Sequence, residues 1–457
     1  MLQRFITDNQ NADVALLALQ RDRYPMLSDS DFRFALQQID GRQRTRDKLP
    51  TFAAIDGWCY PPRLNLEQCS SERTARFKAE LLAARISQLS IVNSQLLIDA
   101  TGGYGVDTFF MSEQAAETHY FEQNADLAAI AEHNFRLAGK SVCCHAESFD
   151  VAALKNFIEP MSKMGAANVE PMSGVLYLDP ARRDSHGGKV FRLEDCTPNV
   201  IEIVRFVQRN YPDLHVLLKL SPMLDFHQAV RQLGGTWGVY VVSVNAEVKE
   251  LLLLSAPAPV VGNPITPIHS REGQGVGLSS SISYIHAVAL DAHGEHIFTF
   301  TPDEESAAEP RYLPNTQSST AQPPNTQLST AQLTNTQLYL FEPDAAILKT
   351  GAFRLLSTRY NLLKAAPNTH LYFSGKPNVD LPGRLWLIVA VYASVRDVQR
   401  AFAGQGITHA NVLTRNYVLP ANTLRRQLRL KDGGNDYIIA CRIADKPVLL
   451  HCKRKNC

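Results

Sequence analysis

The sequence lacks the features that mark membrane-spanning and secreted proteins. Its 457 residues contain no apolar run of about eighteen residues, the length that a membrane-spanning helix needs. The N-terminal stretch MLQRFITDNQNADVALLALQRDR carries acids and amides and has no apolar core followed by small residues, so it does not resemble a signal peptide. We therefore expect a cytoplasmic protein with no membrane partner.

An excess of charge of one sign and a cysteine framework are also missing. The 46 Lys and Arg residues oppose 45 Asp and Glu residues, and a neutral total excludes neither nucleic acid nor a small molecule as ligand. The 8 cysteines form no C-x-x-C pair, which favours free thiols in a reducing compartment. The 13 histidines indicate neither a Ser/His/Asp triad nor a metal-ligating cluster, so we expect no metal.

What the chain does contain is a change of pattern near residue 90. Residues 1–90 place apolar side chains three and four positions apart, which predicts a helical N-terminal domain. Over residues 91–257, short apolar runs such as LLID, THYFE, GVLYLD and LHVLLKL alternate with helical stretches, which predicts a mostly parallel sheet with helices on both faces. Only Asn245 and Ala246 separate the last two strands, so these must pair antiparallel. The predicted fold class is α/β, a doubly wound sheet that ends in an antiparallel hairpin.

After the sheet, the pattern indicates smaller α+β domains, with hairpins that turn near Gly294 and Lys446. A polar ten-residue repeat at 303–338 cannot bury a core, so we expect a disordered insertion there. The predicted segments are 258–345, which holds the repeat, a helical connector at 346–383, and a separate terminal domain at 384–457.

The first strand of the sheet ends in a glycine-rich loop, DATGGYGVD, which runs from Asp99 to Asp107. Glycines between a strand and a helix let the backbone approach a ligand at the crevice outside the strand ends. Glu122 ends the next strand about twenty residues later, where an acid can bind two ribose hydroxyls. The two features together predict a cofactor that carries a nucleoside; a loop of this kind alone also fits a purely structural turn.

Three observations favour S-adenosylmethionine over a nicotinamide dinucleotide. Asp99 can face the cationic methionine end of the first cofactor, directly or through water, whereas its charge would repel a pyrophosphate. Gly102, Gly103 and Gly105 do not have the G-x-G-x-x-G spacing that brings a helix N-terminus onto a pyrophosphate. The terminal antiparallel hairpin suits the methyltransferase variant of the doubly wound sheet. An oxidoreductase is the alternative reading of the same loop.

The stretch GVLYLDPARRD, residues 174–184, ends a buried strand in a carboxylate, a proline and two arginines. Methyl transfer from a sulfonium is an in-line displacement that needs alignment more than acid–base help. Asp179 and Pro180 can offer a carboxylate and a backbone carbonyl to an amine or ring nitrogen, because proline has no N–H and stiffens the turn. Arg182 and Arg183 can hold a phosphate or carboxylate of the substrate, although Arg183 suits a surface ion-pair network equally well.

Further charged residues follow at the next strand end. LLKLSPMLD places Lys219 beside the same crevice, where it can pair with Asp179 or reach solvent as an ordinary strand-end lysine. In the hairpin that follows, we interpret Glu247, Lys249 and Glu250 as residues that keep a sheet edge soluble.

Five stretches, DATGGYGVDTFF, LDPARRD, LKLSPMLD, VNAEVKELLL and EPDAAILKTGAF, together resemble a family of bacterial class I S-adenosylmethionine-dependent methyltransferases. Its members carry a ferredoxin-like segment and a C-terminal THUMP-like domain, and the similarity runs from about residue 70 onward. The resemblance implies a ferredoxin-like segment at 258–345, a THUMP-like domain at 384–457 and S-adenosylmethionine as the cofactor. It implies cofactor contacts at Asp99, Thr101, Gly102, Gly103, Gly105 and Glu122, with Asp179 and Pro180 at the reacting end.

The resemblance also implies an RNA substrate, because THUMP domains are RNA-binding modules of tRNA-modifying enzymes. Arg425, Arg426 and Arg429 add a basic cluster to the terminal segment, which fits a phosphate-binding surface or the solvated face of an amphipathic helix. The chain departs from amino-methylating enzymes with an N/D-P-P-aromatic motif, since Ala181 follows Pro180. A base that is flipped out of its stack would need another aromatic platform, for which Tyr104 is a candidate.

The sequence therefore predicts a methyltransferase of tRNA or rRNA, with Asp179, Pro180 and Arg182 at the reacting centre. Arg183, Lys219 and the three terminal arginines would bind the substrate. Two alternatives stay open: methylation of a small molecule or a protein, and a non-catalytic RNA-binding protein that keeps the cofactor cleft as a relic.

Overall fold

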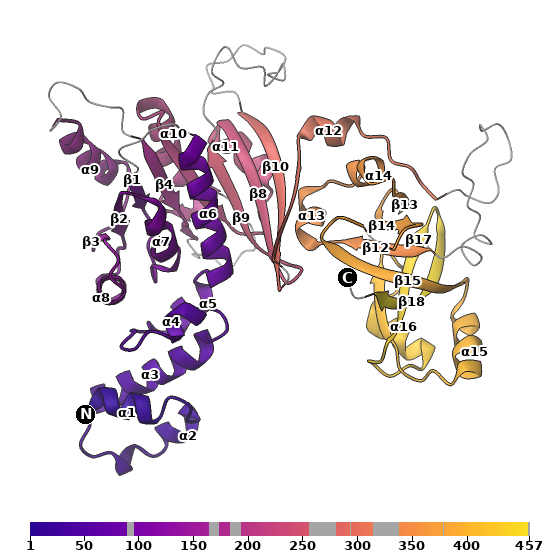
Figure 1. The fold of residues 1–457 in the computed structure, drawn as a ribbon, viewed down its shortest axis with the longest axis horizontal. Helices are drawn as coiled ribbons and strands as arrows, with labels where there is room; N and C mark the ends of the chain where they lie inside the picture. The colour runs from indigo at the N-terminus through magenta and orange to yellow at the C-terminus, as the bar shows by residue number, and fades with distance from the viewer. Residues whose placement is uncertain are drawn as a thin grey trace. The chain divides into compact units, whose positions relative to one another are not determined.

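The computed structural model describes residues 1–88, 96–163, 173–182, 193–255, 280–292, 294–313, 338–377 and 379–455. The chain divides into two compact units, whose elements are labelled in Figure 1. Unit 1 consists of Met1–Tyr240 and Lys249–Ser283, and unit 2 of Val241–Val248 and Tyr284–Cys457. Among the helices in the described ranges, none combines the length and the apolar character that a membrane span requires.

The N-terminal part of unit 1 is helical, as its apolar spacing predicts. Its elements are α1 (Leu2–Asp8), α2 (Val14–Ala18), the short 3-10 helix η1 (Arg21–Arg23), α3 (Asp29–Thr45), α4 (Pro50–Ala53), α5 (Arg63–Gln68) and α6 (Glu72–Gln88). The side chains of Asp13 and Ser28 accept hydrogen bonds from backbone N–H groups in the first turns of α2 and α3, and so cap the N-termini of these helices. Phe5, Phe32 and Ile39 form part of a buried cluster that packs α1 against α3.

The predicted sheet is formed by β1 (Leu96–Asp99), β2 (Glu117–Phe121), β3 (Cys143–His145), β4 (Gly174–Leu178), β7 (Leu214–Leu220), β8 (Gly235–Val244) and β9 (Glu247–Ser255). These strands are neighbours in the order β8-β9-β7-β4-β1-β2-β3. The strands from β7 to β3 are parallel, and β9 pairs antiparallel with β7. Asn245 and Ala246 have φ of 52° and 64°, as a two-residue hairpin turn requires. The predicted α/β fold with a terminal antiparallel hairpin is confirmed.

Helices connect and cover these strands: α7 (Val106–Met111), η2 (Ser112–Gln114), α8 (Ala125–Leu137), α9 (Val151–Lys163), η3 (Leu193–Asp195), α10 (Val200–Asn210) and α11 (Phe226–Leu233). Helix α6 packs against α7, and α10 packs against α9 and α11. Every residue of β1 and β4 is buried, as expected for strands covered on both faces. Beyond the end of β4, the two-residue strands β5 (Ala181–Arg182) and β6 (Cys196–Thr197) pair antiparallel.

The strand order reverses at β1, which has β2 on one side and β4 on the other. In open α/β sheets, ligands bind outside the carboxyl ends of the strands at such a reversal. Asp99 is the last residue of β1, and Asp179 follows the last residue of β4. The topology therefore brings the glycine loop and the Asp179–Pro180 pair to the same end of the sheet.

Strands β10 (Ser280–Asp291) and β11 (Gly294–Phe300) extend the first sheet beyond β8 and form a hairpin that turns where the sequence predicts. The hairpin belongs to unit 2 from Tyr284 onward. The second sheet, in unit 2, has the strand order β13-β14-β12-β15-β18-β17-β16. The strands are β12 (Tyr339–Pro343), β13 (Leu363–Ala366), β14 (Thr369–Ser374), β15 (Gly383–Tyr392), β16 (Asn411–Arg415), β17 (Asp436–Ile443) and β18 (Lys446–Lys455). The helices are α12 (Pro302–Ala307), α13 (Ala345–Thr350), α14 (Leu355–Arg359), α15 (Val395–Gln405) and α16 (Ala421–Leu428).

The predicted segment boundaries stay predictions, but two ranges hold more than we expected. The range 346–383, interpreted as a helical connector, contains α13 and α14 and also the β13–β14 hairpin, whose strands are only a few residues long. Of the repeat at 303–338, residues 314–337 lie outside the described residues. Its start forms α12, where Thr301 and Glu304 make a reciprocal capping box.

Candidate functional site

Side chains from β1 and α7 hold the loop that follows β1. The Oδ1 atom of Asp99 accepts the backbone N–H of Thr101 at 3.0 Å, and its Oδ2 atom accepts the hydroxyl of Thr108. The hydroxyl oxygen of Thr101 in turn accepts the backbone N–H of Asp179 at 2.6 Å. The glycine loop is thus tied directly to the residue that follows β4.

Close packing requires glycine at two positions of the loop. A Cβ atom on Gly102 would lie 2.0 Å from the ring of Tyr120. At Gly105, φ is +78° and a Cβ would lie 2.6 Å from the ring of Phe135. Gly103 differs, because a Cβ there would have only the carbonyl oxygen of Thr101 near it, at 3.8 Å. Internal packing explains the first two glycines, whereas the space next to the Cα atom of Gly103 is open although its N–H and carbonyl are both hydrogen-bonded.

Glu122 lies against Gly103, at the end of β2. Its Oε2 atom accepts the backbone N–H of Gly103 at 2.9 Å, and its Oε1 atom accepts that of Asn124 at 2.7 Å. Each carboxylate oxygen has two lone pairs, so each retains one for a further donor such as a ribose hydroxyl. The half-buried Glu122 side chain is therefore held in place by backbone N–H groups, at the position where we predicted that it binds ribose hydroxyls.

Asp99 lies beneath the loop and is only 1% exposed. Burial raises the pKa of its carboxyl to about 7, and the hydrogen bonds from Thr108 and Thr101 offset only part of that rise. Both carboxylate oxygens already accept hydrogen bonds. The sequence left open a contact with the cofactor made directly or through water, and this geometry favours the contact through water.

Five charged side chains meet beneath the end of β4, and we call them the buried charge cluster: Lys78, Asp107, Asp179, Lys219 and Glu250. The Nζ atom of Lys219 lies 2.7 Å from Oδ2 of Asp179. The Nζ atom of Lys78 lies 2.5 Å from Oε2 of Glu250 and 3.1 Å from Oδ1 of Asp107. Three carboxylates thus surround two ammonium groups, which gives the cluster a formal net charge of −1 with every group ionised.

Two hydroxyl groups add hydrogen bonds to the cluster, although Oδ1 of Asp107 has only the ion pair with Lys78. Ser70 and Tyr177 donate to Oδ2 of Asp107 at 2.8 Å and 2.7 Å, and Ser70 accepts from Lys219 at 3.0 Å. Burial lowers the pKa of Lys219, but the carboxylates, with Asp179 first, outweigh burial and raise it. Burial raises the pKa of Asp107, but Lys78 and Lys219 outweigh burial and lower it. Lys219 and Asp107 are therefore both charged at neutral pH.

The contact between Lys219 and Asp179 confirms one of the two readings that the sequence allowed for that lysine. The reading of Glu250 as a residue of a soluble edge is wrong, because the residue is 3% exposed and pairs with Lys78. Strand β9 lies between β7 and β8, and its residues from Glu250 to Leu254 are buried, whereas Glu247 and Lys249 are exposed. The sequence interpretation missed Lys78, although its spacing from buried Thr74 and Leu82 places it on the buried face of α6.

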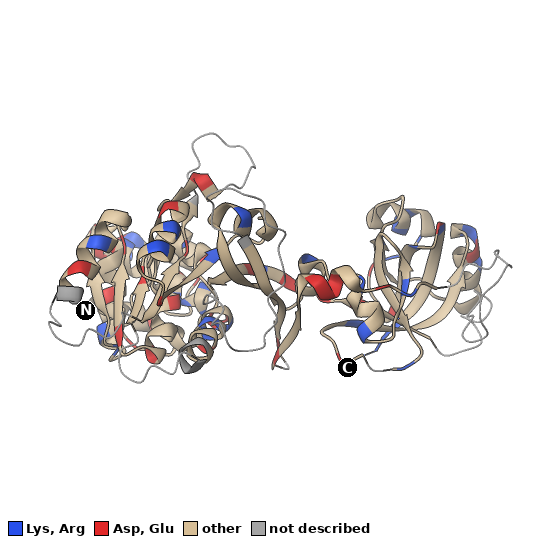
Figure 2. Ribbon diagram, turned by 90° about the horizontal axis from the view of Figure 1, so that it is seen from above, with Lys and Arg blue, Asp and Glu red and all other residues tan. Residues whose placement is uncertain are grey.

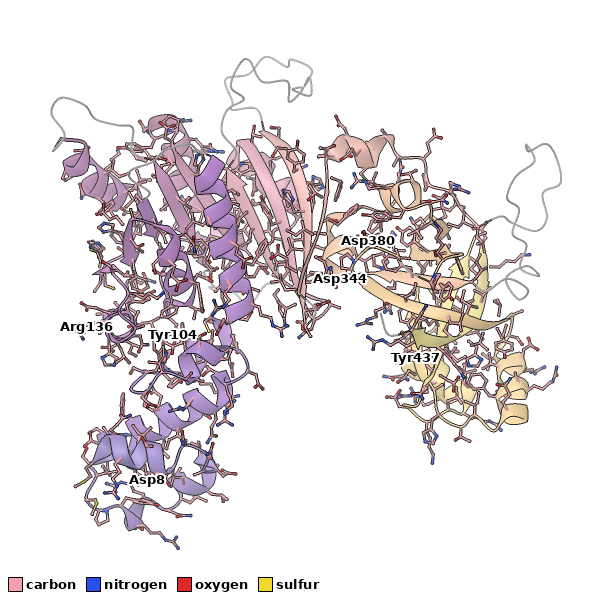
Figure 3. The ribbon with its side chains drawn as sticks, viewed as in Figure 1. Asp8, Tyr104, Arg136, Asp344, Asp380 and Tyr437 are labelled. Atoms are coloured by element: carbon pink, nitrogen blue, oxygen red, sulfur yellow. The ribbon has the colours of Figure 1, made fainter. Side chains whose placement is uncertain are left out.

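Tyr104 is wrong as a stacking platform for a base. The residue is 5% exposed and lies inside unit 1 (Figure 3). Its hydroxyl accepts the indole N–H of Trp58 at 2.6 Å and donates to the carbonyl of Cys59 at 3.2 Å. The ring of Phe52 packs edge-on against it. The aromatic side chain therefore joins the N-terminal helices to the glycine loop.

The remaining predicted site residues lie in different places. Asp179 and Pro180 are half-buried at the end of β4, while the side chain of Arg182 and all of Arg183 lie outside the described residues. Arg425 and Arg426 are on α16 in unit 2, and Arg429 caps its end. Arg425 pairs with Asp432 at 2.8 Å. Acidic and basic residues are interspersed over each unit (Figure 2).

The described residues contain no group of three His, Cys, Asp or Glu side chains that could hold a metal ion.

Comparisons with known proteins assign the C-terminal part of the chain. Residues 339–382 match the family of ferredoxin-like domains, and residues 383–454 match a family described as THUMP domain-like. Both domains that the resemblance implied are thus present. The ferredoxin-like match covers most of the expected connector at 346–383 and only the end of the segment 258–345, because it includes the β13–β14 hairpin.

Among solved structures, a Porphyromonas gingivalis protein that is provisionally assigned as a methyltransferase is 26% identical, with a TM-score of 0.75 over 100% of this chain and 98% of that one. A SAM-dependent methyltransferase from Agrobacterium tumefaciens is 16% identical over 41% of this chain and 62% of that one, with a TM-score of 0.28. A Pyrococcus abyssi tRNA uracil methyltransferase in complex with S-adenosyl-L-homocysteine is 15% identical over 39% and 38%, with a TM-score of 0.23. None of the curated proteins matches the sequence.

Proposed function

We propose that the chain is an S-adenosylmethionine-dependent methyltransferase whose substrate is RNA, either tRNA or rRNA. The observation that carries this proposal is the grouping of residues at the carboxyl ends of β1, β2 and β4, where the topology predicts the ligand crevice of such a sheet. There, the space next to the Cα atom of Gly103 is open, Glu122 accepts the N–H of Gly103, and Asp179 of the buried charge cluster lies across the loop. The full-length similarity in fold to a provisionally assigned methyltransferase supports the same reading.

The charge of the site supports a cationic cofactor. The buried charge cluster has a formal net charge of −1, and Asp99 adds further negative charge above its pKa of about 7. A sulfonium is stabilised next to such a field, whereas a pyrophosphate is repelled by it. Glu122 would bind the ribose hydroxyls, and the backbone of Thr101, Gly102, Gly103 and Gly105 would line the rest of the cofactor.

Asp179 and Pro180 would receive the nucleophile. S-adenosylmethionine supplies, when bound, a methyl group on a positively charged sulfur. The carboxylate of Asp179 is 38% exposed, and Lys219 holds it in one orientation. An ionised carboxylate accepts a hydrogen bond from a substrate N–H and so directs the nitrogen lone pair, and alignment of this kind supplies most of what a displacement reaction needs. Arg182 and Arg183 would bind the phosphate next to the target nucleotide.

The RNA part of the proposal draws on unit 2. The THUMP domain-like segment covers residues 383–454, and α16 within it carries Arg425 and Arg426 on its last turn. The planar guanidinium group of arginine can donate two hydrogen bonds to the oxygens of one phosphate. The THUMP-like fold supports RNA binding by analogy with RNA-binding modules, and the arginines supply the candidate contacts. We propose that this segment grips the RNA backbone while the crevice of unit 1 carries out the transfer.

The cofactor can be tested separately from the substrate. Calorimetric titration of the full chain with S-adenosylhomocysteine should show binding, and titration with NAD should not. Binding of NAD in place of S-adenosylhomocysteine would refute the methyltransferase reading.

The substrate is tested by mass spectrometry of nucleosides from a deletion strain complemented with the wild-type gene or with the variant Asp179→Ala. A methylated nucleoside should return with the wild type and stay absent with the variant. The triple variant Arg425→Ala, Arg426→Ala, Arg429→Ala should lose activity on RNA, and full activity of that variant on the same RNA would refute the assigned role of α16.

A further inference from the structure

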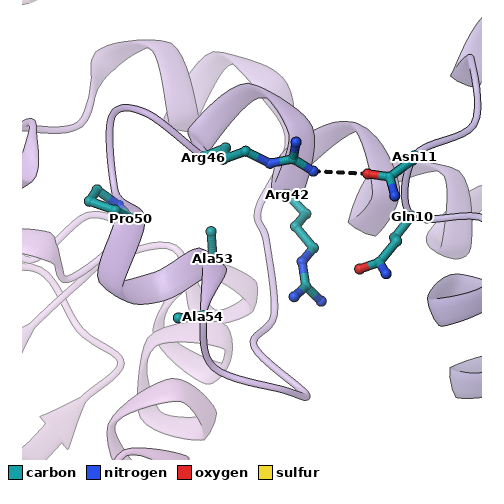
Figure 4. A pocket seen from close by; sticks show the side chains of 7 residues that line it. All are labelled: Gln10, Asn11, Arg42, Arg46, Pro50, Ala53 and Ala54. Carbon is teal, nitrogen blue, oxygen red and sulfur yellow. Dashed lines mark hydrogen bonds between the residues drawn. The ribbon is translucent and has the colours of Figure 1, made fainter.

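Unit 1 has a pocket of about 320 Å³ that shares no lining residue with the crevice (Figure 4). Arg42 and Arg46, at the end of α3, form one side, and the amide side chains of Gln10 and Asn11 form another. Ala53 contributes to an apolar floor. The polar lining groups are thus two guanidinium groups and two amides, and no carboxylate is among them.

The two guanidinium groups of this pocket are placed side by side. Arg42 and Arg46 are four positions apart, so they project from the same face of the helix. Like charges at this spacing destabilise a helix unless an anion lies between them. Each carries a full positive charge, which exceeds the partial negative charge of about one half at a helix C-terminus. The end of α3 therefore attracts anions despite its dipole.

Neighbouring arginines of the N-terminal helices are arranged differently. Arg44 donates to both carboxylate oxygens of Asp40 at 2.7 Å, and Arg63 and Arg76 each pair with a glutamate four positions away. Arg42 instead has Asp56 at 3.9 Å, and that aspartate side chain is 97% exposed. A pair this long and this exposed is screened by water. Within the described residues, Arg46 has no ion-pair partner.

Part of the pocket lining is held in place before any ligand binds. The Nη2 atom of Arg46 donates to Oδ1 of Asn11 at 2.9 Å, the contact drawn in Figure 4. Gln43 donates to the backbone carbonyls of Gln10 and Ala12 at 3.0 Å and 2.8 Å, which fixes this loop against α3. A site whose donors are already positioned binds a ligand at a smaller entropic cost.

We propose that this pocket binds a phosphate group, with Arg42 and Arg46 each donating to one of its oxygens. The RNA backbone is the source that we assign, and this assignment rests on the proposed function. A phosphodiester has two non-bridging oxygens that share one negative charge, so the two planar guanidinium forks can bind it together. The N-terminal helices would then provide a second binding site for the RNA substrate, in addition to the crevice of the same unit.

The test compares the double variant Arg42→Gln, Arg46→Gln with a matched control, Arg44→Gln. The control removes a positive charge from the same helix but from outside the pocket. The affinity of each full-length protein for a fluorescent tRNA is measured by anisotropy over a range of salt concentrations, without cofactor. Losing one phosphate contact should weaken binding about fivefold at 0.1 M salt and lower the log–log salt slope by about 0.7–0.9. The control should keep the wild-type slope.

Other outcomes separate the sources of the phosphate. Inorganic pyrophosphate is titrated against the wild type, the double variant and the Arg44→Gln control by calorimetry. If the variant loses pyrophosphate binding but keeps the RNA salt slope, the RNA assignment is overturned and a small phosphorylated ligand takes its place. If the double variant and the Arg44→Gln control match in both assays, the pocket is not a phosphate site.

Two controls keep the result independent of folding and of the proposed reaction. The variant Arg42→Lys, Arg46→Lys keeps both charges, so it should keep most of the salt slope, and all variants should melt within a few degrees of the wild type. Titration with S-adenosylhomocysteine reports on the crevice alone. A protein that lacks cofactor binding but shows the expected RNA slopes would refute the methyltransferase reading and leave the pocket standing.

Discussion

Replacing Lys78 by methionine tests whether the buried charge cluster is a single electrostatic unit. Methionine has nearly the same length and shape as lysine, so the change removes the charge with little change in packing. Lys78 is 0% exposed. Its Nζ atom forms ion pairs with Oδ1 of Asp107, at 3.1 Å, and with Oε2 of Glu250, at 2.5 Å. Without it, both of these carboxylate oxygens stay buried and lose their cation.

The expected cost follows from this burial. Breaking a buried ion pair by removing one partner costs about 3–5 kcal/mol. Asp107 keeps the hydroxyls of Ser70 and Tyr177, which favours the low end, so we expect a loss of about 3 kcal/mol. Lys219 does not compensate, because it lies 3.8 Å from Asp107 and 3.9 Å from Glu250 and is already paired with Asp179.

Urea denaturation, monitored by hydrogen exchange in peptides that cover α6 and β9, measures the free energy of unfolding of unit 1. The double variant Lys78→Met, Glu250→Gln should recover part of the loss, because one unpaired carboxylate becomes a neutral amide. As a control, Arg63→Met removes the cation of an exposed ion pair and should change the free energy of unfolding little.

The effect of pH has a definite sign. In the wild type the pKa of Asp107 is lowered, so this group contributes stability above its unfolded pKa and loses it as the pH falls through the folded value. Without Lys78, burial dominates and raises that pKa, so the variant loses stability as the pH rises. The difference between wild type and variant should therefore grow from acid to neutral pH. A difference below about 1 kcal/mol that does not change with pH would refute the cluster as a unit.

Three further predictions concern the crevice. Because burial holds the pKa of Asp99 at about 7 and a cationic ligand favours its ionised form, the affinity for S-adenosylmethionine should rise between pH 6 and 8 relative to that for S-adenosylhomocysteine, as calorimetry would detect; a constant ratio would contradict the effect of Asp99. Gly102→Ala should abolish cofactor binding, since its Cβ would lie 2.0 Å from the Tyr120 ring, while Gly404→Ala, with nothing within 4 Å, should be neutral in the same titration. In Lys219→Met, Asp179 loses the cation that favours its ionised form, so the rate of methyl transfer should be low at pH 7 and rise with pH. A flat pH profile would show that the Asp179 carboxylate does not accept the hydrogen bond from the substrate.

Local pattern was enough to predict the sheet and the placement of the crevice. The alternation of strands and helices specified parallel pairing, and the two-residue link at Asn245 and Ala246 specified the antiparallel hairpin. The acids Asp99, Glu122 and Asp179 each come at the end of a strand. Because the carboxyl ends of parallel strands share one edge of a sheet, the sequence placed these acids at one end of the domain.

Tertiary packing alone decided which charges are buried together. Ser70 and Glu250 bond across 180 positions, and Lys78 and Glu250 across 172, so no local period relates them. In the sequence, Glu250 lies close to a hairpin turn, which indicates an exposed polar residue. In the structure, β9 lies between β7 and β8, inside the sheet. Docking of α6 on the sheet then removes water from these groups. A charge in that position is tolerated only beside opposite charges, and the position of those partners depends on how distant segments pack.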